Sequence, residues 1–279
     1  MRNLLVLIIV VIVSIPAIFA QNVGQKADTA KLINYTDIQG NRQGNWHRKF
    51  ANGKTAFTGY FVTNKLIGDY KRYYESGTLK AYVKYNKTGT VGYAVLYWDS
   101  SKRMADGKYI NQNVKDSIWN YYGTDGILKA SESYKAGLKD GVSKSYYPSG
   151  KQLMILTYKD GKKNGVWKTL YEDGVARFET KHVNDKRDGP FNVYYENGRI
   201  YLKGKYKNDA PDGKWITYNP DGTVLKEVEY INGHMVNEEK FDDEFKKQMK
   251  EWEGMKGKIP EPNEGSFYNG GGKKGSNFE

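Results

Sequence analysis

Residues 165–174 read GVWKTLYEDG and residues 189–198 read GPFNVYYENG. Each stretch begins with glycine, has an aromatic residue two positions later, and ends in Asp-Gly or Asn-Gly. Aligned on the first glycine, the pattern recurs eight times at a spacing of 24 residues, with one spacing of 25. A fixed period over this many units predicts a repeat array. The eight units start at Gly44, Gly68, Gly92, Ser117, Gly141, Gly165, Gly189 and Gly213.

Turn residues within each unit predict a β-hairpin. Nine positions after each start stands a glycine, or a serine in the third unit, and Asn, Asp or Ser precedes it. Such pairs supply the positive φ of a tight turn, and Pro148 and Pro220 suit a type I turn that closes through a glycine bulge. A second turn is expected where one unit enters the next, at Asp140-Gly141, Asn164-Gly165, Asp188-Gly189 and Asp212-Gly213.

Two columns of mainly aromatic residues run through the units. The column 17 positions after the start holds Phe61, Tyr85, Tyr109, Tyr134, Tyr158, His182, Tyr206 and Tyr230, and we expect it to pack between successive hairpins. The column two positions after the start holds Trp46, Tyr70, Ala94, Trp119, Ser143, Trp167, Phe191 and Trp215. If the tryptophans of the second column lie under neighbouring rings they belong to the core, and if they stay open they form stacking platforms.

These features predict an all-β fold, an elongated, twisted antiparallel β-meander of eight hairpins of about 24 residues. Sixteen strands at ~4.8 Å make a ribbon on the order of 75 Å long. The composition agrees, because apolar residues make up only 38% of the chain while 24 tyrosines and 31 glycines are present. Each hairpin buries its face against its neighbours, so the first and last need caps.

The units that begin at Gly165 and Gly189 resemble the bacterial MORN repeat variant, a family often labelled YwqK-like antitoxin. The resemblance covers about residues 41–236 and implies a fold of repeated hairpins. The third unit departs from it, with Ala94 in place of the aromatic residue and Ser100-Ser101 at the turn. The label also suggests neutralisation of a toxin, which for an exported chain means an immunity protein.

The two ends differ from the repeats. Residues 1–20 combine Arg2, an apolar run and a small-residue ending at Ala20, the pattern of a cleaved secretory signal peptide. We therefore expect an exported protein in the periplasm, at the outer membrane or outside the cell, with no transmembrane segment after cleavage. Residues 21–40 are read as a leader that pairs with the first hairpin. The chain has no cysteine, which excludes disulfides and lipid attachment through cysteine.

An amphipathic helix is expected over 237–253, capped by Asn237 and carrying Phe241, Phe245, Met249 and Trp252 on one face. Two roles stay open, since this helix can cap the array or dock a partner. Residues 254–279, rich in Gly, Lys, Asn and Glu, are expected to be flexible.

No constellation of catalytic residues stands out, and His47, His182 and His234 fall in different units. We expect no catalytic residue, cofactor or metal, and a binding or assembly scaffold in the bacterial envelope, whose partner is another envelope or outer-membrane protein. A cell-wall glycan or anionic polymer is the alternative, in line with the formal charge of +12, whereas export argues against nucleic acid. The candidate partner-binding residues are Trp46, Tyr70, Trp119, Trp167, Trp215, Phe241, Phe245 and Trp252.

Overall fold

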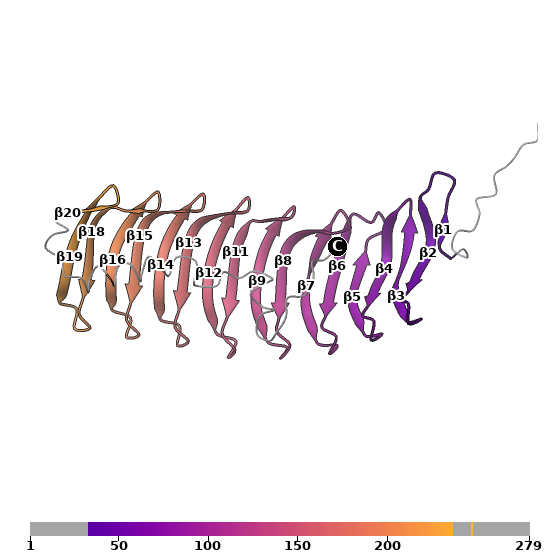
Figure 1. Cartoon of the computed structure of the whole chain (residues 1–279), viewed down its shortest axis with the longest axis horizontal. Helices are drawn as coiled ribbons and strands as arrows, with labels where there is room; N and C mark the ends of the chain where they lie inside the picture. The colour runs from indigo at the N-terminus through magenta and orange to yellow at the C-terminus, as the bar shows by residue number, and fades with distance from the viewer. Residues whose placement is uncertain (1–32, 237–246, 248–279) are drawn as a thin grey trace, which may run out of the picture.

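The chain folds into one long antiparallel β-ribbon (Figure 1). This computed structural model describes residues 33–236 and residue 247. Each strand pairs with its neighbours in sequence, which confirms the predicted all-β meander. The strands are β1 (Tyr35–Thr36), β2 (Arg42–Lys49), β3 (Thr55–Val62), β4 (Lys65–Tyr73), β5 (Leu79–Tyr85), β6 (Val91–Tyr97), β7 (Arg103–Ile110), β8 (Val114–Tyr122), β9 (Leu128–Lys135), β10 (Leu138–Lys139), β11 (Gly141–Tyr146), β12 (Gln152–Lys159), β13 (Lys162–Leu170), β14 (Ala176–Val183), β15 (Lys186–Tyr194), β16 (Ile200–Lys207), β17 (Ala210–Pro211), β18 (Gly213–Tyr218), β19 (Val224–Ile231) and β20 (His234–Val236).

Eight two-stranded units account for β2 to β19, because β10 and β11 both pair with β9, and β17 and β18 both pair with β16. The leader contributes β1, which pairs with β2 through Tyr35 and Gln43. The signal peptide, the rest of the leader, the predicted helix and the tail lie outside the described residues, apart from Lys247. Within the described part, no helix is long and apolar enough to cross a membrane.

The hairpin tips are type I turns closed by a residue with positive φ. In the sixth unit the Gly174 amide donates to the Tyr171 carbonyl over 2.9 Å, and Gly174 has φ +95°. This is the type I turn that Pro148 and Pro220 predict, so the prediction is confirmed. In the third unit Ser101 takes φ +64° and donates to Trp98 over 2.8 Å. Serine thus fills the glycine position, and the tip keeps its shape.

The predicted second turn is misplaced. In five units the chain reverses four or five residues before the start, for example at Asn184 and Asp185, which have φ +49° and +72° as in a type I′ turn. The glycine of Asp188-Gly189 lies inside β15 instead, with φ +120°, beside a register shift between Thr180 and His182. A glycine with positive φ at a register shift is a bulge that bends the strand. Start glycines with positive φ, such as Gly189, therefore bend strands and do not join units.

One face of the ribbon, here called the inner face, buries many of its side chains against one another within the single sheet that the described strands form. It carries both aromatic columns, and their ring contacts run from unit to unit, as in the 5.3 Å between the centroids of Phe191 and Trp215. Within the Tyr column, Tyr158 and Tyr206 are each 6% exposed. The expected core packing of this column is confirmed.

Side-chain volume is shared between neighbouring strands of the inner face. A Cβ added to Gly204 would lie 2.3 Å from Cδ2 of the Trp215 ring, because that ring covers the glycine. Gly107 and Trp119 stand in the same relation. Where the Trp column instead holds a small residue, Ala94, the preceding strand pairs it with Val83. A large ring over glycine and a small residue beside valine fill similar space.

Hydrogen bonds link each hairpin tip to the next. In five units the residue six positions after the start is a tyrosine or tryptophan, and its side chain donates to a backbone carbonyl of the following unit. The bonds run from Tyr74 to Tyr97 (2.7 Å), Trp98 to Tyr122 (3.2 Å), Tyr147 to Leu170 (2.8 Å), Tyr171 to Tyr194 (3.1 Å) and Tyr195 to Tyr218 (2.7 Å). These bonds fix the distance between successive tips.

Cations cover the other edge of the aromatic columns. In five units the residue two positions before the start lies over a ring of the same unit, with the charged group 3.7–5.4 Å from the ring centroid. The pairs are Arg42 and Phe61 (4.5 Å), Lys115 and Trp119 (5.1 Å), Lys139 and Tyr158 (5.1 Å), Lys163 and Trp167 (5.4 Å) and Arg187 and Tyr206 (3.7 Å). These five cations therefore contribute to the packing of the array.

The sharing of volume predicts compensation between Gly204 and Trp215. We expect Gly204→Val to lower the free energy of unfolding by about 2 kcal/mol through overpacking, and Trp215→Ala by about 3–5 kcal/mol through a cavity. The double variant, which copies the Val83 and Ala94 pair, should be more stable than the sum of the two losses by at least about 1 kcal/mol. Urea unfolding measures all three, and strictly additive losses would contradict the sharing.

Candidate binding groove

The structure places the predicted contact residues mostly in the core. Trp119, Trp167 and Trp215 are 0%, 8% and 3% exposed, so neighbouring side chains cover their rings. Trp46 and Tyr70 are half-buried, and Phe241, Phe245 and Trp252 lie outside the described residues. A one-layer ribbon can bury its apolar face only against itself, and the largest rings do most of this. The three covered tryptophans therefore offer no stacking platform.

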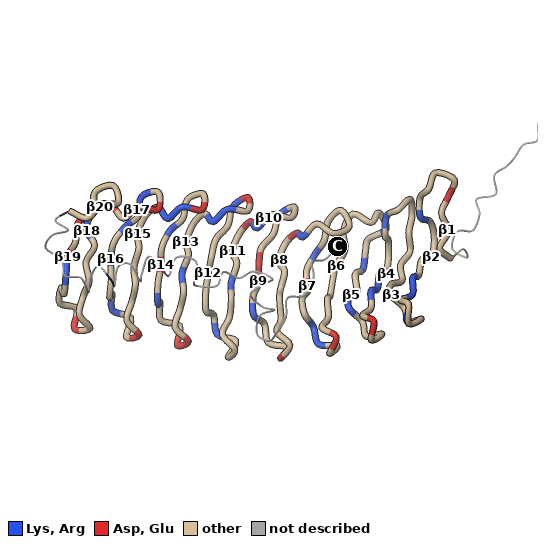
Figure 2. The backbone as a smooth tube through the Cα atoms, viewed as in Figure 1, with Lys and Arg blue, Asp and Glu red and all other residues tan. Residues whose placement is uncertain are grey.

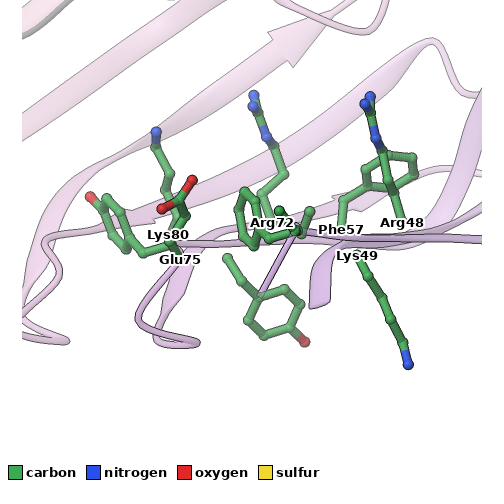
Figure 3. Close-up of a pocket in the computed structure, with 11 residues that line it drawn as sticks. Arg48, Lys49, Phe57, Arg72, Glu75 and Lys80 are labelled. Carbon is green, nitrogen blue, oxygen red and sulfur yellow. The ribbon is translucent and has the colours of Figure 1, made fainter. Parts of the chain in front are cut away.

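A groove of about 530 Å³ lies at the N-terminal end of the inner face, over β2 to β5 (Figure 3). Figure 2 marks basic segments of β2 and β4 there, near the hairpin tips. The wall combines cations with aromatic rings and holds one carboxylate. It consists of Arg48, Lys49, Phe50, Ala51, Ala56, Phe57, Arg72, Tyr73, Tyr74, Glu75 and Lys80.

Strand register sets two arginines on either side of one ring. Phe57 in β3 pairs with Arg48 in β2 and with Arg72 in β4. Directly paired residues of neighbouring strands share a face, so the three side chains form one row, cation, ring, cation. In Figure 3, Arg48, Arg72 and Lys80 point to the same side.

The charges of this row lack the ring contacts that Arg42, Lys115, Lys139, Lys163 and Arg187 have. Both arginines are exposed, and neither forms an ion pair within the described part of the chain. Lys80 lies over the Tyr74 ring at 5.1 Å, and burial, then the Arg72 charge, lowers the pKa of its ammonium. The groove thus gathers like charges that repel one another. Such a site favours an anion, and guanidinium groups bind carboxylates in a bidentate manner.

The row is unusual within the array. Four positions after the unit start, where the first two units hold Arg48 and Arg72, the later units hold neutral residues that pack in the inner face. These are Leu96, Tyr121, Ser145, Thr169, Val193 and Thr217. Folding alone favours neutral side chains here, so the arginines need another explanation. The sequence signal for this row is the change from arginine to neutral residues four positions after the unit start.

A second polar cluster lies inside the core of the fourth and fifth units. The Glu132 side chain is 0% exposed, and its carboxylate accepts from Lys139 Nζ at 2.7 Å and from the Tyr134 hydroxyl at 2.6 Å. Lys115 Nζ donates to the Tyr121 hydroxyl at 2.9 Å. Ser143, on the neighbouring strand β11, has the smallest polar side chain of the Trp column and leaves room for these groups. The cluster is paired and enclosed, so we assign it to stability.

Burial makes Lys115 the titrating member of this cluster. It lowers the pKa of the ammonium group to about 8, against the opposing attraction of Glu132 and with a further contribution from Lys139. Burial also raises the pKa of the Tyr121 phenol, which therefore stays protonated. Mild alkali therefore removes the proton of Lys115 within the folded core.

The opposite, outer face carries a row of exposed apolar side chains. One position after the unit start, Tyr93, Ile118, Val142 and Val166 are 65%, 57%, 42% and 43% exposed. Successive members lie two strands apart, so the row runs along the ribbon. It is a second surface that a partner can contact.

Similarity to known proteins identifies the type of repeat in part of the array. Four segments match the MORN repeat variant. They are residues 66–87, 139–160, 187–208 and 211–232. Each match to the MORN repeat variant spans one hairpin connection from strand to strand, such as β15 to β16 for the third. The predicted resemblance therefore holds for these units. No curated protein matches the chain.

Solved structures with local similarity include TarM, at 16% identity and a TM-score of 0.25 over 34% of this chain and 20% of that one. The Photorhabdus luminescens Tc holotoxin pore, with a TccC3 mutation, matches at 12% identity and a TM-score of 0.18 over 69% of this chain and 14% of that one. The TcdB2-TccC3-Cdc42 structure matches at 12% identity and a TM-score of 0.15 over 71% of this chain and 15% of that one. The chain spans a fifth or less of the length of these proteins.

The Lys115 cluster predicts a dependence of stability on pH. The unfolded chain keeps this proton to about pH 10.4, whereas the folded chain releases it near pH 8, so the unfolded state binds more protons between these values. Raising the pH from about 7.5 to 9.5 should therefore increase the free energy of unfolding of the wild type relative to Lys115→Met. Urea unfolding of both proteins at each pH measures the difference, and parallel pH profiles would contradict it.

Proposed function

We propose that this protein is a non-catalytic, exported binding scaffold of the bacterial envelope, and that the groove over β2 to β5 contacts an anionic segment of a protein partner. The observation that carries the proposal is the row of Arg48, Phe57 and Arg72, in which two exposed cations without ion pairs flank a ring. A long ribbon of repeats holds such a groove in place and offers further surface along its length.

A protein partner suits the groove better than a sugar does. Protein interfaces are enriched in arginine and aromatic residues, which the groove combines, and the outer row of Tyr93, Ile118, Val142 and Val166 adds apolar contact area. Glycan binding depended on open tryptophan rings, and Trp119, Trp167 and Trp215 are covered. The MORN repeat variant matches support a repeat scaffold.

Export rests on the amino-terminal sequence. The apolar run that follows Arg2 and the small-residue ending at Ala20 support cleavage after Ala20. An envelope location also agrees with a chain that has no cysteine to oxidise.

Cell fractionation tests the export. We expect the protein recovered from the periplasmic or outer-membrane fraction to begin at Gln21, as read by mass spectrometry of its amino-terminal peptide. Recovery in the cytoplasmic fraction with residues 1–20 attached would contradict export.

Affinity purification tests the groove. Cross-linked envelope extracts should yield partners with the wild type that are reduced at least tenfold with Arg48→Gln/Arg72→Gln, because the row loses both guanidinium groups. The matched control, Lys203→Gln/Lys207→Gln, removes two exposed cations that lie away from both the groove and the outer row, and it should retain the partners. Equal recovery with all three proteins would remove the groove from the proposed function.

A further inference from the structure

The cations and rings of the binding groove favour an acidic, aromatic occupant, and the same chain carries a segment of that chemistry. Residues 238–245 read EEKFDDEF, the densest run of carboxylates in the chain. Five carboxylates and one lysine make it strongly negative, and Phe241 and Phe245 add two rings. Arginine forks pair with carboxylates, and aromatic rings pack against phenylalanine and guanidinium groups. Charge and ring content are therefore complementary on the two sides.

The groove lies at one end of the described ribbon, and the acidic segment follows in sequence the last strand at the other end. The groove is formed by β2 to β5, whereas the acidic segment begins two residues after β20, which ends at Val236. Figure 1 shows these strands at the two ends of the ribbon. From β4 to β20 the sheet advances by about fourteen inter-strand steps of ~4.8 Å, on the order of 65 Å.

The chain is too short to close this distance within one molecule. Nine extended residues from 237 to 245 span at most about 31 Å. The acidic segment of a molecule therefore falls short of its own groove by about half the separation. A second molecule has no such restriction, because its groove can approach the last strand directly.

We propose that the acidic segment 238–245 of one molecule binds the groove at Arg48, Phe57 and Arg72 of another, so that copies of the protein associate head to tail. The proposal rests on the proposed function and names the partner of that site as a second copy. The groove and the segment are different surfaces, so the contact is heterologous and leaves one of each free at the ends of every assembly. Such contacts extend into chains unless their rotation closes a ring.

The electrostatic part of the contact makes it sensitive to salt. The Debye length falls from about 10 Å at 0.1 M to about 3 Å at 1 M ionic strength, and exposed charges are screened accordingly. Association should therefore weaken in 1 M salt while the array stays folded, since ring packing and backbone bonds hold its core.

Sedimentation velocity of the purified protein tests the association. We expect species larger than the monomer whose share grows with protein concentration and falls in 1 M salt. Arg48→Glu/Arg72→Glu reverses the charge of the row, and Asp242→Lys/Asp243→Lys brings the net charge of the segment from −4 to zero. Each variant alone should be monomeric. An equimolar mixture of the two should form dimers, because the unchanged groove of one variant then meets the unchanged acidic segment of the other.

A matched control and a folding check complete the test. Lys181→Glu/Lys203→Glu makes the same change of charge on exposed positions away from the groove, and this variant should associate like the wild type. Circular dichroism and the thermal midpoint should be unchanged in the groove variant, because both arginines are exposed. Association that survives in either charge-reversed variant, or a mixture that stays monomeric, would overturn the proposal.

The outcomes separate this inference from the proposed function. If the wild type is monomeric at every concentration, yet Arg48→Gln/Arg72→Gln still loses envelope partners, the groove binds another protein and self-association is excluded. If a purified polyanion such as polyglutamate displaces the partner while the wild type stays monomeric, the groove binds anionic polymers and self-association is again excluded.

Discussion

The fold depends on one constraint, that a single layer of sheet has to bury its own apolar face. A sandwich covers each sheet with another, whereas the strands of residues 33–236 form a single sheet. It meets the constraint with bulges at the start glycines, such as Gly189, which bend each strand, and with rings large enough to reach the next hairpin. The covered rings of Trp119 and Trp215 follow directly from this.

Because burial is local, neighbouring units have to fit one another. The glycine beneath each of these two rings belongs to the preceding strand, and the Val83 and Ala94 pair solves the same problem with opposite sizes. The tip hydrogen bonds, such as that from Tyr195 to Tyr218, tie the other end of each hairpin to the next. Stability is then a sum of contacts between neighbours, as in other repeat arrays, and a departure such as Ser143 is compensated nearby, by Glu132 and its partners.

Much of this architecture could be predicted from the sequence, because it repeats. The period located the hairpins, the Asp-Gly and Asn-Gly pairs located the tips, and the Tyr column identified the core. Two features escaped for physical reasons. Asp188-Gly189 is as compatible with a bulge as with a turn, and only the strand register distinguishes them. Trp167 in a half-buried column can stack on a ligand or on a neighbour, and burial depends on how far the strand bends.

The groove could not be predicted from any unit alone, because it is defined by a difference between units and by pairing across three strands. Arg48 and Arg72 stand 24 residues apart and become neighbours of Phe57 only through the register of β2, β3 and β4. Its place near the end of the array has a physical basis. Arg48 and Arg72 are exposed, whereas the neutral residues of the same column are buried from the fourth unit onward, and a buried position holds a charge only at a high cost in free energy. Position in the array thus decides which column serves folding and which can serve binding.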